Sequence, residues 1–457
     1  MSVITASRGE RASATPPFGA NFRLLMGGSF ISMLGSRVSS IAYPLLVLRL
    51  TGSAADAGWA SFAALAPSAL AYLPAGALID RWDPRKAMLR SEMGRGAVIL
   101  AIVTLLVSHL IGVVGLVELA AVEQILAVFS GLAERRFASS LVEPRQVVPA
   151  LASSEARTHM VILVGRPLGG LLFGLWRLLP FLADSLSFAV TVGALWRIGK
   201  RQGGGSRERV ASLHLWHEIT NVFGWLRRHR FAEIALLLTG GATLVSQALI
   251  MVFFAEAHVG KLPSIGIGVV LAASGAGGAL GSAAASLLFR HFEYHLLQIQ
   301  MLIWAVMFGI LFLWGGPSFW VMAAVMAVMG LTGALGNIEV DTFLVQNAKT
   351  MLARVMSVGR LTSLVALALG PLLGAFLFAR FGFERAIFGL LLITVALLAV
   401  ALSALPSALR KMHRRCDQRA SREDDDGRGG RRRTLAHRGV PASVTRRKPT
   451  ASGSAAR

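Results

Sequence analysis

The chain has 457 residues, of which 54% are hydrophobic and only 15% are charged, and its mean hydropathy is +0.61. These values exclude an ordinary soluble protein, because a soluble fold needs more polar residues to cover its surface. The formal net charge of +22 does not indicate nucleic-acid binding, since Lys and Arg gather in the C-terminal tail and in short gaps between apolar runs.

Long apolar stretches follow one another along the chain. A helix that crosses a bilayer needs about 20 mainly apolar residues, and twelve stretches satisfy this condition. Their approximate bounds are 22–48, 56–79, 86–109, 112–136, 155–176, 178–198, 230–256, 264–289, 295–314, 317–345, 354–379 and 384–406. The sequence therefore predicts an all-α membrane protein with twelve transmembrane helices.

The two halves of the chain resemble each other weakly. "VSSIAYPLLVLRLTGSAADAGW" from Val38 parallels "VSQALIMVFFAEAHVGKLPSIGIG" from Val245, and "GRPLGGLLF" from Gly165 parallels "GPLLGAFLF" from Gly370. The two pairs have nearly the same spacing along the chain, which indicates a duplicated six-span unit. Two pseudo-symmetric six-helix bundles of this kind are one known plan for secondary transporters.

The composition divides the chain into five parts. A helical stripe around Trp216 suits an amphipathic helix lying on the membrane surface, whereas the tail is rich in Arg, Gly, Ser and Asp and is expected to be disordered. The predicted parts are an N-terminal segment (1–20), a first bundle (21–198), a linker with the amphipathic helix (199–229), a second bundle (230–406) and a basic tail (407–457).

The segments between the predicted spans are alternately rich and poor in Lys and Arg. Lys and Arg are frequent before the first span and after the even-numbered spans, whereas the other gaps hold few, with Arg380 and Arg385 as an exception. By the positive-inside rule, this asymmetry predicts that both termini are cytoplasmic and that the number of spans is even. The expected location is the cytoplasmic (inner) membrane.

The gap between spans two and three carries a motif. "GALIDRWDPRK" resembles the loop signature of the major facilitator superfamily through Gly76, Asp80, Arg81 and Arg85, with Leu78 also matching. Asp83 and Pro84 depart from that signature, where the family has Gly and Arg.

Longer stretches are similar to the bacterial drug and siderophore exporter branch of that superfamily, which includes enterobactin exporters and macrolide efflux proteins. They are "NFRLLMGGSFISMLGSRVSSIAYPLLVLRLTGS", "SSEARTHMVILVGRPLGGLLF", "LPFLADSLSF" and "ARVMSVGRLTSLVALALGPLLGAFLF". The resemblance implies export of an antibiotic, drug or siderophore by proton antiport and alternating access, with a cavity lined by spans one, four, seven and ten.

The loop motif has two interpretations. In the first, Gly76 permits close helix packing, Asp80 faces the N-terminus of span eleven as the resemblance implies, and Arg81 and Arg85 reach Glu134, so that the loop is a cytoplasmic gate. In the second, the loop is an ordinary basic segment that only sets topology.

Charged residues inside the spans are costly and therefore mark function. Glu123 and Asp184 are candidates for proton coupling, because burial favours the neutral form of a carboxylic acid. Arg37 and Arg166 are candidate counter-charges or substrate contacts. The alternative is a set of static buried ion pairs. Glu339 and Asp341 also lie within a span.

Glycines mark two sites of helix packing. Gly165, Pro167, Gly169 and Gly170 resemble the span-five motif of drug antiporters, and they predict tight packing and a bend at the proline. "SGAGGALGS", from Ser274, imitates a nucleotide-binding loop, but it lies inside an apolar run, which favours helix packing.

The sequence contains no catalytic constellation, no Walker A motif and a single cysteine, so we expect no enzymatic activity, no cofactor and no metal site. The expected partners are a small-molecule substrate, protons and the lipid bilayer, with no nucleic acid, and the expected state is a monomer. An uptake permease, by symport or facilitated diffusion, and a membrane sensor or scaffold remain as alternative functions.

Overall fold

A computed structural model describes residues 18–143, 147–198, 224–260, 262–289, 295–314, 318–348 and 352–436. The chain divides into two units, Met1–Leu405 and Pro406–Arg457. Most of the predicted linker and nearly all of the N-terminal segment lie outside the described residues. The first unit holds the helices that form the site.

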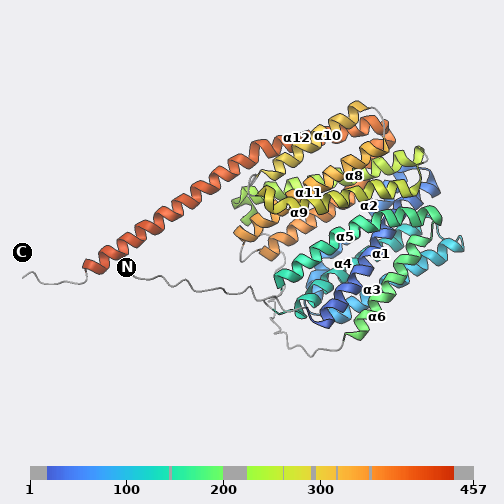
Figure 1. The fold of residues 1–457 in the computed structure, drawn as a ribbon, viewed down its shortest axis with the longest axis horizontal. Helices are drawn as coiled ribbons and strands as arrows, with labels where there is room; N and C mark the ends of the chain where they lie inside the picture. The colour runs from blue at the N-terminus through green and yellow to red at the C-terminus, as the bar shows by residue number, and fades with distance from the viewer. Residues whose placement is uncertain are drawn as a thin grey trace, which may run out of the picture. The chain divides into compact units, whose positions relative to one another are not determined.

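The first half of this unit contains six helices, drawn blue to green in Figure 1. They are α1 (Ala20–Thr51), α2 (Ala54–Ile79), α3 (Pro84–Val107), α4 (Val113–Ser140), α5 (Val147–Leu175) and α6 (Leu179–Arg197). The second half contains α8 (Arg230–Val259), α9 (Ser264–Phe289), α10 (Leu296–Trp314), α11 (Phe319–Ala348) and α12 (Leu352–Ala436).

Helix α12 carries two passes because its backbone breaks at Gly382. This residue has φ 75° and ψ −179°, a conformation that glycine adopts without steric cost. Gly52, with φ 67°, similarly ends α1 in the left-handed region. With α12 divided at Gly382, the described helices form the twelve passes in two six-helix bundles that the sequence predicts.

Local sequence explains where several helices begin. The Ser53 hydroxyl accepts from the Asp56 N–H at 3.2 Å and caps α2. Asp83 accepts from the backbone N–H groups of Arg85 and Lys86 at 2.9 and 3.2 Å, and Pro84 follows it in the first turn of α3. The two departures from the family signature thus form the start of this helix.

Eight described helical segments are long and apolar enough to cross a membrane by length and composition. Helices α2, α3 and α5 complete the passes; α3 begins with charged residues, and the apolar part of α5 is Met160–Leu175. Side chains on the outer faces of the bundle, such as Leu70, Leu313 and Trp320, are largely exposed, which suits contact with lipid.

Glycines bring the two halves together. A Cβ at Gly268 of α9 would lie 2.6 Å from the Arg166 carbonyl oxygen of α5, and one at Gly275 would lie 2.8 Å from the Leu163 nitrogen. On α2, Gly58 lies against Ala375 of α12. Gly275 belongs to the "SGAGGALGS" segment, so the prediction that this segment packs helices together is confirmed.

From residue 407 the structure describes a helix through Ala436, and the expected disorder of the tail stays a prediction. Residues 407–424 contain Ala, Leu, Arg, Lys, Met and Gln, which are strong helix formers. They also extend an existing helix, which avoids the cost of nucleation. Residues 437–457 lie outside the described part.

Candidate functional site

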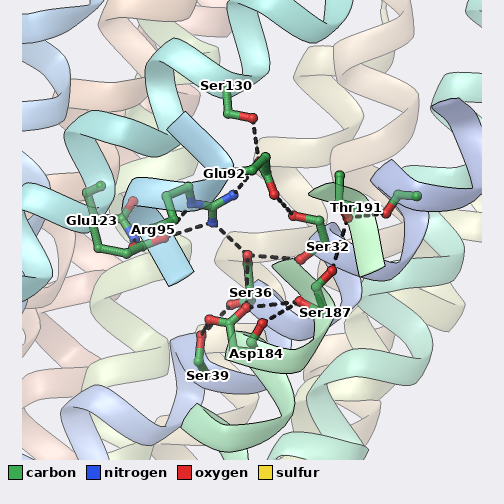
Figure 2. A network of polar contacts seen from close by, with 12 residues as sticks. Ser32, Ser36, Ser39, Glu92, Arg95, Glu123, Ser130, Asp184, Ser187 and Thr191 are labelled. Carbon is green, nitrogen blue, oxygen red and sulfur yellow. Dashed lines mark hydrogen bonds and ion pairs between the residues drawn. The ribbon is translucent and has the colours of Figure 1, made fainter. Parts of the chain in front are cut away.

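A buried polar cluster lies inside the first half of the bundle, where α1, α3, α4 and α6 pack against one another (Figure 2). Each helix presents polar residues at helical spacing, so that they share its inner face. We refer to these residues together as the acidic cluster: Ser32, Ser36 and Ser39 of α1, Glu92 and Arg95 of α3, Glu123 and Ser130 of α4, and Asp184 and Ser187 of α6.

Arg95 is the centre of the acidic cluster. Its guanidinium donates to Glu123 Oε1 at 2.8 Å, to Glu92 Oε1 at 3.2 Å and to the Ser36 hydroxyl at 2.7 Å. Its Cζ also lies 4.4 Å from the centroid of the Phe188 ring, a cation–π contact. The arginine thus joins three helices through two buried glutamates and a partly buried serine.

Glu92 and Asp184 receive hydroxyl donors from α1. The Ser32 hydroxyl donates to Glu92 Oε2 at 2.8 Å, and the Ser39 hydroxyl donates to Asp184 Oδ2 at 2.6 Å. Ser36 reaches Asp184 Oδ1 at 3.4 Å and therefore lies between this carboxylate and Arg95. Asp184 has an exposed fraction of 0% and Glu123 of 3%, so the hydroxyls replace water as hydrogen-bond donors.

Small residues on α1 make this arrangement possible. A Cβ at Gly35 would lie 2.7 Å from Ser187 Cβ and 2.8 Å from Asp184 Oδ1. At Gly28, two turns earlier, a Cβ would lie 3.1 Å from Ala194 Cβ. The two glycines let α1 approach α6 closely enough for serine hydroxyls to reach the aspartate.

The charges of the acidic cluster do not balance if every group is ionised, because three carboxylates face one guanidinium. An uncompensated charge inside a membrane protein is costly. The cluster can lower this cost by holding protons, and its hydroxyls can both donate and accept as those protons come and go. This arrangement suits reversible proton binding.

The structure brings the two predicted proton-coupling residues, Glu123 and Asp184, into one network. The sequence reasoning overlooked Glu92 and Arg95, which lie next to the basic start of α3 and resemble a span boundary. Their spacing of three residues, which places both on one face of a helix, was the available signal.

The predicted cavity arginines lie outside the acidic cluster. Arg166 donates to the Leu271 carbonyl oxygen at 3.0 Å and to the Ser274 hydroxyl, both on α9. Arg37 is exposed and lies beside Gly165, where a Cβ would come within 2.8 Å of Arg37 Cβ. Neither arginine forms a salt bridge with a described carboxylate.

The loop residues are arranged differently from the expectation. Asp80 pairs with Arg136 of α4 at 2.6 Å. Arg85 donates to the Leu195 carbonyl oxygen at 2.7 Å, at the C-terminus of α6, where a cation is favourable. The expected contact between Arg85 and Glu134 is not formed in this structure.

Glu134 instead pairs with Arg157 of α5 at 2.7 Å. Arg81 is exposed. At Gly76, a Cβ would meet no described atom within 4 Å. The close helix contact expected at this glycine is therefore absent from the described part of the structure.

The span-five glycines lie in contact with neighbouring helices. A Cβ at Gly169 would lie 2.6 Å from the Val38 carbonyl oxygen of α1, and Gly170 faces Ser264 and Gly268 of α9. Pro167 lies in the same stretch, with its Cα 3.0 Å from the Cβ position of Gly268. Within the described residues, no group of three or more His, Cys, Asp or Glu side chains is suited to hold a metal ion.

Comparison with known proteins provides a family and a fold. The sequence matches the family described as Major Facilitator Superfamily over residues 25–297, more than half of the chain. No curated protein matches it.

Similar solved structures include the nucleoside transporter NupG (TM-score 0.66, 11% identity, covering 84% of this chain and 99% of that one). A bacterial homologue of the iron transporter ferroportin in the inward-facing state has a TM-score of 0.65 and 16% identity, covering 84% of this chain and 98% of its own. The D-xylose-proton symporter has a TM-score of 0.66 and 11% identity, and the match covers 85% of this chain and 98% of the symporter.

Proposed function

Because the chain belongs to the major facilitator superfamily, we propose that it exports a hydrophobic or amphipathic small molecule across the cytoplasmic membrane in exchange for protons. The observation that carries the coupling is the acidic cluster, in which three carboxylates and one arginine are buried together. A transporter that uses a proton gradient needs a buried group that binds and releases a proton during each cycle.

Asp184 is the carboxylate best suited to exchange the proton. Arg95 contacts Glu92 and Glu123 directly, whereas it reaches Asp184 only through Ser36. An ionised Asp184 therefore receives less direct compensation than the two glutamates. Glu123 is the second candidate, because its Oε1 atom would lose the guanidinium if Arg95 moved toward Asp184.

The loop after α2 is proposed as the gate on the cytoplasmic side. Its Asp80–Arg136 pair joins two helices of the same half, and both side chains are about half exposed. A surface pair of this kind contributes about 0–1 kcal/mol, so the aspartate can change partners at little cost. During the cycle it would leave Arg136 for the start of α12, which closes the cytoplasmic side.

The distribution of Lys and Arg supports an orientation with both termini in the cytoplasm. Export rests on the similarity of four long stretches to drug and siderophore exporters. Proton-linked uptake is the second candidate, since the acidic cluster would serve a symporter equally well and a proton symporter shares the fold. The two candidates differ in the direction of proton flow relative to the substrate.

A two-stage experiment tests the proposal. Cells with and without the chain are first compared for growth in a panel of antibiotics and dyes, which identifies an exported compound. Purified protein is then placed in liposomes that contain a pH-sensitive dye, and that compound is added on one side. Antiport moves protons toward the side from which the compound leaves. Transport of the compound without any proton movement would refute the coupling.

A further inference from the structure

Three arginines from the two halves of the bundle lie near one another. Arg37 of α1 interacts electrostatically with Arg166 of α5 and with Arg360 of α12, and both interactions are repulsions between like charges. Helices α1 and α5 belong to the first half, whereas α12 belongs to the second. Arg37 thus feels positive charge from both halves of the bundle.

The protein supplies no carboxylate to Arg37 or Arg166 in the salt bridges of the described residues. Arg166 uses its guanidinium for the Leu271 carbonyl oxygen and the Ser274 hydroxyl. These neutral partners hold the side chain in place but do not neutralise its positive charge.

The exposure of these side chains is informative because they lie within membrane spans. Arg37 and Arg360 are exposed, and Arg166 is partly exposed. An arginine that faced the lipid at this depth would cost several kcal/mol. Arg166 bonds to the Leu271 carbonyl oxygen of α9 in the second half, and Gly165 beside it packs on Arg37. Arg37 and Arg166 therefore lie at the boundary between the halves, where we expect a transported molecule to pass.

Arg37 leaves α1 from a different face than the serines that contact the acidic cluster. Ser32, Ser36 and Ser39 place one face of α1 against Glu92 and Asp184. Residue 37 is rotated by about 100° from residue 36 on a helix, so its side chain leaves from a different face. The acidic cluster and Arg37 thus lie on different faces of α1.

We propose that Arg37, Arg166 and Arg360 bind a negatively charged group of the transported molecule, which is therefore an organic anion that carries a carboxylate or a phosphate. This inference rests on the proposed transport function. Guanidinium groups bind both anions through paired hydrogen bonds. An anion between the halves would also relieve the repulsion of Arg37 by Arg166 and by Arg360.

A binding experiment with the purified full chain tests this inference. The probes are benzoate and phenyl phosphate, with benzamide as the neutral match of benzoate and sodium chloride to hold the ionic strength constant. Thermal unfolding is followed while each probe is titrated. At least one of the two anions is expected to raise the unfolding temperature with saturation, whereas benzamide does not. Tighter binding of benzoate would indicate recognition of a carboxylate, and tighter binding of phenyl phosphate would indicate recognition of a phosphate.

Variants connect the binding to the arginines. Arg37→Gln and Arg166→Gln are each expected to weaken anion binding about ten- to hundredfold, the range for a hydrogen bond to a charged group. Arg37→Lys keeps the positive charge and is expected to weaken anion binding less than Arg37→Gln does. Arg385→Gln removes an exposed arginine elsewhere on α12 and should bind as the wild type does. Equal effects of benzoate and benzamide, no response to either anion, or wild-type binding by both Gln variants would each overturn the inference.

The result is separable from the proposed proton coupling. Anion binding is measured in detergent, where no proton gradient is present, whereas proton movement is measured in liposomes. Proton movement in liposomes without anion binding would refute this inference alone. Anion binding without proton movement would instead refute the coupling.

Discussion

Replacement of Asp184 by Asn is expected to uncouple transport from the proton gradient while the protein still folds. Asn keeps a carbonyl oxygen as a hydrogen-bond acceptor, and its amide can donate to the Ser39 hydroxyl, which lies 2.6 Å from Asp184 Oδ2. The loss of one charged hydrogen-bond acceptor costs about 1–3 kcal/mol. The amide cannot exchange a proton, so the cluster loses one binding position for it.

The pH gradient across the membrane sets how strongly the substrate can accumulate. A difference of one pH unit is worth about 1.4 kcal/mol per proton, which sustains about a tenfold concentration ratio of substrate when one proton moves per molecule. Wild-type liposomes should approach that ratio. Liposomes with Asp184→Asn should approach a ratio of about one, because without proton exchange the gradient contributes no free energy.

The assay compares accumulation with exchange. Liposomes are given a pH gradient of about one unit, and the final ratio of the compound identified by the growth comparison is measured. Exchange of labelled for unlabelled compound without a gradient shows that the variant still binds and moves its substrate. Glu339→Gln is the matched control, since Glu339 is also a buried carboxylate but lies in the second half, where it accepts from the Leu297 N–H at 2.7 Å.

A wild-type accumulation ratio in Asp184→Asn would show that this aspartate does not carry the coupled proton. Loss of exchange together with accumulation would show that the variant is damaged rather than uncoupled. In the first case, the same measurement on Glu123→Gln would test the second candidate.

The remaining predictions concern the structure around the site. Arg95→Gln leaves buried carboxylates without their cation and should lower stability by about 3–5 kcal/mol, measured by denaturation in detergent; wild-type stability would contradict the central role of this arginine. Gly35→Leu should abolish transport, since even a Cβ there lies 2.7 Å from Ser187 Cβ, and normal transport would show that α1 can move away. Asp80→Asn should slow transport in liposomes without reducing the amount of protein in the membrane; an unchanged rate would leave the loop as a topology signal. Glu339→Leu should cost about 1–3 kcal/mol through an unpaired backbone N–H, and a smaller loss than that of Glu339→Gln would refute this.

The sequence by itself determined the fold class and the position of each pass. Hydropathy is a local property, and a bilayer requires each pass to be a helix of sufficient length, so the predicted stretches and the observed helices agree closely. The separation of α12 into two passes was also predicted, and Gly382 shows where the backbone turns.

Only the tertiary structure decided which charges meet. Glu123 and Asp184 were identified as unusual charges within spans, but Glu92 and Arg95, which connect them, resembled residues at a span boundary. The pairs Asp80–Arg136 and Glu134–Arg157 also differ from the expected contacts. Helix periodicity fixes the face on which a residue lies, whereas the partner of that face depends on how helices distant in sequence pack. The small residues of α1, α5 and α9 set those distances, and this packing holds the acidic cluster apart from Arg166, whose partners lie on α9.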